Sequence, residues 1–135
     1  MDNIEKLSMY LNSINIKNIK LSVSAPFHCE LMKTATELMR NELSKIVFKD
    51  FRTALISNVT AQEINESSLI CDLLIRQIES RVRWRESINY MIKNGVNNFI
   101  EIGPGKILSG LVKRIDKKVK VSAINNEEDI NKIEI

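Results

Sequence analysis

Cysteine is scarce in this chain of 135 residues, whose only two thiols are Cys29 and Cys71. Two cysteines so far apart match neither a disulfide framework nor the ligand spacing of a zinc site, so we expect reduced thiols and no bound metal. Long apolar runs are also missing, since none approaches the ~20 residues that a membrane-spanning helix needs. Residues 1–6 are polar and acidic before any apolar stretch begins, which is not typical of a signal peptide. The sequence therefore predicts a cytoplasmic protein that does not enter a membrane.

A strong charge of either sign is absent as well, because the formal net charge is only +3. The basic side chains of the second half are not interleaved with aromatic residues and no DNA- or RNA-binding motif is present, so we expect no nucleic-acid partner. These side chains form either ordinary solvated helix faces or a surface for an acidic protein: Arg81, Arg83, Arg85, Lys113, Arg114, Lys117 and Lys118. The turn at residues 103–106 is not a phosphate-binding loop, because Ile100 and Ile107 stand where that motif needs glycine and Ser or Thr.

Helical and strand patterns alternate along the chain, whose length fits one domain. Apolar residues at helical spacing predict helices at 3–14, 29–46, 66–80, 84–93 and 106–116, with an acidic helical tail near the end. Asp2 or Asn3 is a possible N-cap of the first helix, and Asn94-Gly95 should stop the fourth in a C-cap. The first two helices each have one apolar stripe: Ile4, Leu7, Leu11 and Ile14 in the first, and Leu31, Ala35, Leu38, Met39, Leu43 and Ile46 in the second. Short apolar runs predict strands at 18–24, 53–59, 99–102 and 119–123, of which 53–59 is expected to be buried. This alternation indicates a three-layer α/β fold. The first helix and strand have no β-α neighbours within the chain, so we expect them to belong to a separate small domain.

The chain has a single histidine, His28, which follows the predicted strand 18–24. Pro26 braces a bend there, and catalytic groups of α/β folds tend to lie at strand ends. Histidine suits proton transfer at neutral pH because its usual pKa is about 6.5. Most isolated histidines are structural, however, and no nucleophile stands beside this one. Taken alone, the residue is either one half of a catalytic site or a structural histidine.

Five stretches of the chain follow one another in an order that matches a known family. They are residues 24–32 (SAPFHCELM), 56–60 (ISNVT), 76–78 (RQI), 82–88 (VRWRESI) and 101–111 (EIGPGKILSGL). Together, from about Leu21 to Asn126, they resemble the malonyl-CoA:acyl-carrier-protein transacylases of bacterial fatty-acid synthesis. The resemblance implies that residues 25–135 are the C-terminal part of an α/β-hydrolase-like acyltransferase domain. It also implies that residues 1–24 are the last helix and strand of a ferredoxin-like subdomain.

The resemblance gives roles to three residues. His28 would be the general base that takes the proton of a serine hydroxyl and then protonates the leaving thiolate. Gln77 would supply, through a carbonyl, the acceptor that fixes the tautomer of the imidazole. Phe27 stands at a position that correlates with the extender unit in related polyketide acyltransferases, and its bulk would favour malonyl over larger acyl groups. Without the resemblance, Gln77 is a surface residue of a helix and Phe27 a core aromatic.

The nucleophile of the family is missing from these residues, because no serine lies in the G-H-S-x-G elbow that carries it. The family's malonyl-binding arginine and part of its oxyanion hole also belong to the absent portion. We therefore predict that the chain alone is inactive. A separate N-terminal half would supply the serine for transfer of malonyl from malonyl-CoA to the thiol of the acyl carrier protein.

The partners that the resemblance implies are malonyl-CoA and the acyl carrier protein, with no cofactor beyond these substrates. Carrier proteins are acidic, so the basic side chains of the second half would help to dock one. Two alternatives remain open at this point. The chain could be a non-catalytic module that binds the carrier protein, or an inactive remnant of a truncated gene.

Overall fold

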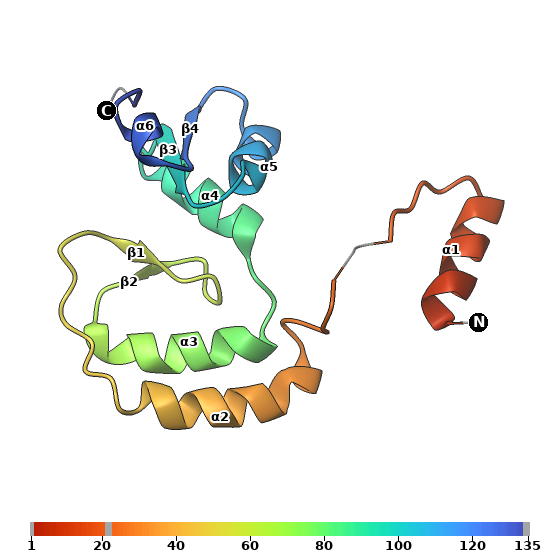
Figure 1. The fold of residues 1–135 in the computed structure, drawn as a ribbon, viewed down its shortest axis with the longest axis horizontal. Coiled ribbons are helices and arrows are strands. Elements are labelled where there is room, and N and C mark those ends of the chain that lie inside the picture. The colour runs from red at the N-terminus through yellow and green to blue at the C-terminus, as the bar shows by residue number, and fades with distance from the viewer. Residues whose placement is uncertain (1, 21–22, 134–135) are drawn as a thin grey trace.

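Figure 1 shows a chain of mixed helices and strands, which confirms the predicted α/β class. The structure is a computed structural model, and it describes residues 2–20 and 23–133. The helices are α1 (Asn3–Ser13), α2 (Lys33–Leu43), α3 (Ile70–Glu79), α4 (Trp84–Lys93), α5 (Ile107–Ile115) and α6 (Glu127–Ile130). The strands are β1 (Leu55–Ile56), β2 (Glu63–Ile64), β3 (Asn98–Ile102) and β4 (Lys120–Ile124). Short 3₁₀ turns at Glu30–Met32 and Ser67–Leu69 lead into α2 and α3.

The C-terminal part is a β-α-β unit in which α5 connects β3 to β4. The two strands pair in parallel, and a parallel pair requires such a crossover. The buried cluster of this unit joins Ile88 of α4 to Val112 of α5 and to Val119, just before β4. Partly buried Phe99 and Val121 of the strands pack against this cluster. The apolar stripes of α4 and α5 therefore pack against the β3–β4 sheet.

The end of α4 lies where the sequence predicts it, at Asn94 and Gly95. Gly95 has a φ of +90°, a conformation that glycine adopts without a steric penalty. Its N–H donates to Ile92 O at 3.0 Å, and the N–H of Val96 donates to Met91 O at 3.0 Å. These two bonds form a complete Schellman cap, which satisfies carbonyls at the end of the helix.

The middle of the chain forms a helix pair with a small hairpin beside it. Figure 1 shows α2 and α3 side by side, and the two helices are in extensive contact. β1 and β2 pair antiparallel, with Leu55 opposite Ile64. A hollow of about 270 Å³ separates this hairpin from α3. The end of α3 that carries Gln77 therefore lies near the β1–β2 hairpin.

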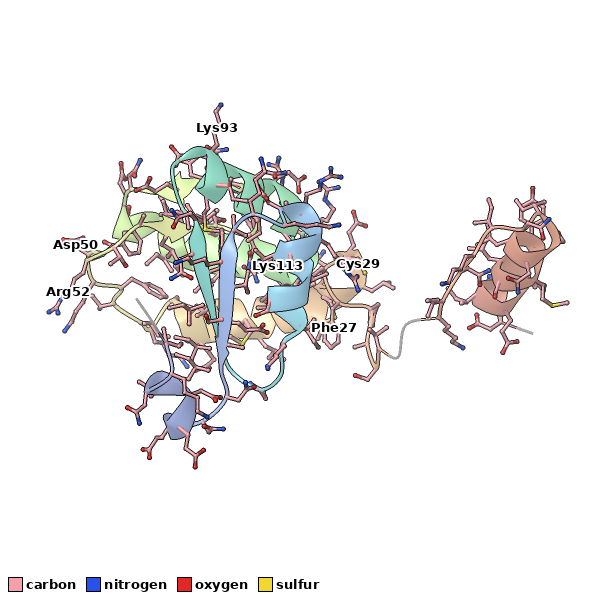
Figure 2. All side chains as sticks on the ribbon, turned by 90° about the horizontal axis from the view of Figure 1, so that it is seen from above. Phe27, Cys29, Asp50, Arg52, Lys93 and Lys113 are labelled. Atoms are coloured by element: carbon pink, nitrogen blue, oxygen red, sulfur yellow. The ribbon has the colours of Figure 1, made fainter. Side chains whose placement is uncertain are left out.

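The N-terminal helix stands apart from the rest of the chain in both Figure 1 and Figure 2. Asp2 caps α1 by accepting a hydrogen bond from the N–H of Ile4, as the sequence predicts. Helix α1 has no buried residue, and Ile4 and Leu7 of its predicted apolar stripe are exposed. The stripe is thus formed but has nothing to pack against within the described residues.

Two strand predictions are wrong or only partly right. No strand forms at residues 18–20 or 23–24, while Leu21 and Ser22 lie outside the described residues. The predicted strand 53–59 shrinks to Leu55–Ile56, and Leu55 is 41% exposed rather than buried. A strand needs hydrogen bonds from a neighbour along its length. The first segment has no such neighbour among the described residues, and the second has only the two-residue β2.

The predicted helix 29–46 is also less buried than its pattern suggests. It is split into a 3₁₀ turn and α2, and Leu43 alone of its six-residue apolar stripe is buried. Leu31, Leu38 and Ile46 of that stripe are exposed. Among the described residues, no helix has the length and apolar character that crossing a membrane requires.

Candidate active site

The turn that carries His28 is held by hydrogen bonds within residues 25–29. The N–H of Phe27 donates to Ala25 O at 2.9 Å, and the thiol of Cys29 donates to Pro26 O at 3.2 Å. His28 itself has a φ of +61°. This left-handed conformation costs a non-glycine residue about 1–3 kcal/mol and is found most often at functional sites. The turn thus holds the exposed imidazole in a direction that a relaxed backbone would not give it.

The imidazole of His28 meets the main chain of Gln77 at the end of α3. The distance from Nδ1 of His28 to the carbonyl oxygen of Gln77 is 2.8 Å. A carbonyl oxygen only accepts, so Nδ1 carries the proton and donates it. The second ring nitrogen, Nε2, is then left with a free lone pair. An imidazole in this tautomer is able to accept a proton at Nε2.

The end of α3 explains why the carbonyl of Gln77 has no hydrogen-bond partner within the helix and can accept one from His28. The last four carbonyls of a helix have no partner inside it. Ser80 donates its N–H to Arg76 O at 3.0 Å and then leaves the helix with an extended ψ of 148°. The Gln77 carbonyl, one residue further, is satisfied by His28 instead. The C-terminal end of a helix carries partial negative charge, so Nδ1 of His28 meets the negative end of α3.

The side chain of Gln77 faces the turn of the β1–β2 hairpin. Nδ2 of Asn58 donates to Oε1 of Gln77 at 3.4 Å. Asn58 and Gln77 also line the polar end of the hollow between the hairpin and α3, whose remaining walls are mainly apolar. The role of Asn58 at this site was not predicted from the sequence. The available signal was its place in the matched stretch 56–60.

Phe27 lies next to His28 in the chain, but its ring does not join a core. Its side chain is 56% exposed, so the reading of Phe27 as a core aromatic is wrong for this chain. Figure 2 shows Phe27 and Cys29 where the chain leaves the compact part toward α1. His28 and Gln77 are therefore the pair that the structure brings together, and Phe27 precedes His28 in the sequence.

Several of the basic side chains are engaged within the fold. Nζ of Lys113 donates to Val119 O at 2.6 Å and to Lys117 O at 3.3 Å, which ties α5 to the loop that precedes β4. Arg81 and Arg83 both pair with Glu86 Oε1, at 2.7 and 3.5 Å. The N–H of Glu86 itself, followed by the charges of the two guanidinium groups, holds the pKa of Glu86 below its usual range.

The turn at residues 103–106 is a tight strand-to-helix connection. Gly103 and Gly105 have φ values of +141° and +94°, which other residues rarely adopt. The carboxylate of Glu101 caps α5 by accepting the N–H of Leu108 at 3.1 Å and that of Ser109 at 2.7 Å. Ser109, through its hydroxyl and then its N–H, holds the pKa of Glu101 below its usual range.

Known proteins resemble this chain in sequence and in fold. No family model matches the chain. The chain is 48% identical to the malonyl CoA-acyl carrier protein transacylase of Bacillus subtilis over 112 residues, which are 83% of this chain and 35% of that protein. It also matches the crystal structure of the transacylase from Clostridium perfringens, with a TM-score of 0.84 and 39% identity over 96% of this chain and 41% of the other.

A third match is a malonyl-transacylase in complex with its type II PKS acyl-carrier protein, with a TM-score of 0.83 and 31% identity. That match covers 95% of this chain and 42% of the other. The fold and the sequence together thus define an acyltransferase-like portion of a protein. The chain belongs to the malonyl CoA-acyl carrier protein transacylase family, and it spans about two fifths of the length of the relatives that it matches. This share is consistent with the C-terminal portion that the motifs predict.

Proposed function

We propose that this chain supplies the general base for transfer of a malonyl group from malonyl-CoA to the thiol of an acyl carrier protein. The observation that carries the proposal is the 2.8 Å contact between Nδ1 of His28 and the carbonyl of Gln77. It is supported by the family names of the relatives and by the carrier-protein complex of one solved relative. The serine nucleophile belongs to a portion of the fold outside these 135 residues.

The proposed chemistry uses Nε2 of His28 twice. In the first half-reaction Nε2 takes the serine proton as the serine oxygen attacks the thioester carbonyl, and the imidazolium then protonates the leaving thiolate of coenzyme A. The malonyl group is left as a serine ester. In the second half-reaction Nε2 takes the proton of the carrier-protein thiol, the sulfur attacks the ester, and the proton returns to the serine oxygen. Every step uses side chains and substrate groups, so the proposal includes no metal or cofactor.

The carbonyl of Gln77 has a positioning role in this scheme. It fixes the proton on Nδ1 in each neutral state and accepts the same hydrogen bond from the imidazolium. A neutral acceptor gives less charge stabilisation than the carboxylate of a Ser-His-Asp triad, and the negative end of α3 adds to it. Both half-reactions pass through the imidazolium of His28, so the hydrogen bond to the Gln77 carbonyl assists both.

Phe27 is proposed to narrow the acyl pocket next to His28. A substituent on the α-carbon of malonyl would need the space of the aromatic ring, and one methyl group in such a pocket is worth about 1–3 kcal/mol. Exchange of Phe27 for serine should therefore lower the preference for malonyl over methylmalonyl by about 10- to 100-fold. A competition assay with both thioesters measures this ratio directly.

The proposal extends to the two parts of the chain. We place residues 1–24 in a ferredoxin-like subdomain and residues 25–135 in the large acyltransferase domain. Support comes from the separation of α1 in Figure 1 and from the unpartnered apolar stripe that α1 carries. In the complete fold, further strands would cover that stripe and the hollow beside α3.

The decisive experiment reconstitutes the site. The portion of the Bacillus subtilis transacylase that this chain does not match is coexpressed with this chain, and malonyl transfer to carrier protein is measured. General base catalysis typically contributes 10²–10⁴-fold, so His28→Ala should lower kcat by about that factor. Gln77→Ala keeps the main-chain carbonyl, so it should retain most of the activity. Equal rates with and without His28 would contradict the proposal.

A second measurement uses the chain by itself. Because the chain carries no serine elbow, malonyl-CoA should leave no covalent adduct in an intact-mass spectrum. A serine-linked malonyl adduct on the isolated chain would overturn the assignment of the nucleophile to another portion. Carrier-protein binding by a reconstituted complex that never turns over would instead favour a non-catalytic binding module.

A further inference from the structure

The turn between β1 and β2, residues 57–61, is closed by its own hydrogen bonds. Oγ of Ser57 accepts the N–H of Val59 at 3.1 Å and that of Thr60 at 3.4 Å. The N–H of Ala61 donates to Ser57 O at 2.8 Å, and both Ser57 and Ala61 are buried. These bonds fix the shape of the turn. The carbonyls of Asn58 and Thr60 are not used within it and are available to a partner.

Arg83 binds both of these carbonyls. Its main-chain N–H donates to Asn58 O at 2.9 Å, and Nη1 of its guanidinium donates to Thr60 O at 2.9 Å. Its Nε lies 3.5 Å from Oε1 of Glu86 in the first turn of α4. Arg83 thus joins the hairpin turn to the short linker, residues 80–83, that separates α3 from α4.

The position of this linker decides what happens to the Gln77 carbonyl. In a helix the N–H of residue i bonds to the carbonyl of residue i−4. If α3 continued past Glu79, the N–H of Arg81 would therefore bond to Gln77 O. The linker instead leaves the helix at Ser80 and runs to the hairpin turn, where Arg83 is bound. An extended linker keeps the carbonyl of Gln77 available to His28.

We propose that Arg83 is a positioning residue for His28. Its guanidinium on the Thr60 carbonyl, added to the main-chain bond to Asn58, prevents α3 from gaining a turn and so reserves the Gln77 carbonyl for Nδ1 of His28. The contact from Asn58 to the Gln77 side chain holds the same residue from the hairpin side. The catalytic consequence rests on the proposed function, whereas the effect on the imidazole is a property of this chain alone.

The single histidine makes this effect measurable without any transfer activity. Long-range ¹H–¹⁵N NMR spectra of the ¹⁵N-labelled chain, recorded where the ring is neutral, report which ring nitrogen carries the proton. The chain with Arg83 intact should show the Nδ1–H tautomer. Arg83→Ala removes the side-chain bond to Thr60 O and leaves only the main-chain bond to Asn58 O. The pattern should therefore shift toward Nε2–H, the form that an unpartnered imidazole in water prefers, and the amide of residue 81 should gain protection against exchange.

Arg81 provides the matched control, because it lies in the same linker and pairs with the same carboxylate. Its side chain is 77% exposed and, among the described residues, it makes no side-chain hydrogen bond to the hairpin turn. Arg81→Ala should therefore keep the Nδ1–H tautomer. Arg81→Pro in the Arg83→Ala background removes the competing N–H, so it should restore the Nδ1–H pattern, a rescue that a merely structural role for Arg83 would not produce.

The outcomes separate this inference from the proposed function. If the chain with Arg83 intact already shows Nε2–H, the contact between His28 and Gln77 is absent and both proposals fail. If it shows Nδ1–H and a folded Arg83→Ala variant does too, the positioning role alone is overturned. Should Arg83→Ala lose its helical spectrum, Arg83→Met takes its place, because it keeps the aliphatic part of the side chain and removes the donor. A folded Arg83→Met variant with an unchanged tautomer and an unprotected residue 81 would equally overturn the role.

Discussion

The accessible surface of the chain predicts that it does not remain a compact monomer by itself. Its area is 10,970 Å². A folded monomer of 15.5 kDa exposes about 7,200 Å² by the scaling of area with mass. An obligate interface buries roughly 1,000–2,500 Å² on each partner, so the excess of about 3,800 Å² on this one chain exceeds what such an interface covers. The chain therefore carries the surface of an unfilled interface.

Two exposed side chains give this prediction a magnitude. Leu7 of α1 is 52% exposed and Ile102 of β3 is 80% exposed. Complete burial of such a side chain contributes about 1.5–3 kcal/mol. Scaled by the exposed fraction, Leu7→Gln should weaken association by about 1 kcal/mol, or about fivefold, and Ile102→Gln by about 2 kcal/mol, or about thirtyfold.

Sedimentation velocity over a wide range of concentration tests this prediction. The chain alone should form dimers or larger species and bind an apolar dye, and both signals should fall when the remaining portion of the fold is added. Lys120→Gln is the control on the same sheet, because that side chain is exposed and polar and should leave association unchanged. A monomer at every concentration that unfolds in one cooperative step would refute the reasoning.

Further predictions concern the stability of the folded part. Ile88→Ala should lower the free energy of unfolding by about 2–5 kcal/mol, because Ile88 is 1% exposed. Ile107→Ala, at an exposed site, should change it by less than about 0.5 kcal/mol. Urea titrations of the two variants measure this difference. The pKa of Glu101 is lowered from 4.5, so its carboxylate stabilises the fold above about pH 4.5 and loses that effect as the pH falls through the lowered pKa; Glu101→Gln should flatten this acid dependence in melts at several pH values. Gly105→Ala should lower the free energy of unfolding by about 1 kcal/mol, because the φ of Gly105 is +94°. Gly110→Ala should raise it by about 0.5–1 kcal/mol, because Gly110 lies inside α5 and an added Cβ would meet no atom within 4 Å apart from the helix's own backbone. Thermal melts should show Tm changes of opposite sign for the two variants.

The sequence predicted best what depends on residues close together in the chain. Helix α4 and its cap at Asn94 and Gly95 were predicted within a residue, because the amphipathic stripe and the glycine are local signals. The β3–α5–β4 unit followed from the same kind of pattern, and its strands differ from the prediction by one residue at their ends. In both cases the described part of the chain contains the partner that the pattern needs: α4 and α5 pack in one buried cluster, and β3 pairs with β4.

The candidate site could be predicted only in part. His28 and Gln77 are 49 residues apart, and no periodicity indicates that they meet; their pairing was expected from the resemblance, which pointed to a carbonyl of Gln77. The positive φ of His28 and the binding of Arg83 to two hairpin carbonyls could not be foreseen. Main-chain carbonyls are the same in every residue, so which of them is free depends on where a helix ends and not on a side chain in the sequence.

The wrong strand predictions have one physical cause, and it bears on function. A strand pattern describes a place in a sheet. The described residues of the segment 18–24 have no neighbouring strand, and the segment 53–59 has only the two-residue β2. Leu55 is exposed and the described ends of the first segment form no ladder, yet both stretches keep the apolar residues that a buried strand would use. Selection for burial in a larger sheet explains these residues, whereas an isolated chain has no use for them. The failed predictions therefore mark the surface on which the remaining portion of the transacylase fold should bind, and that surface includes the hollow next to Gln77.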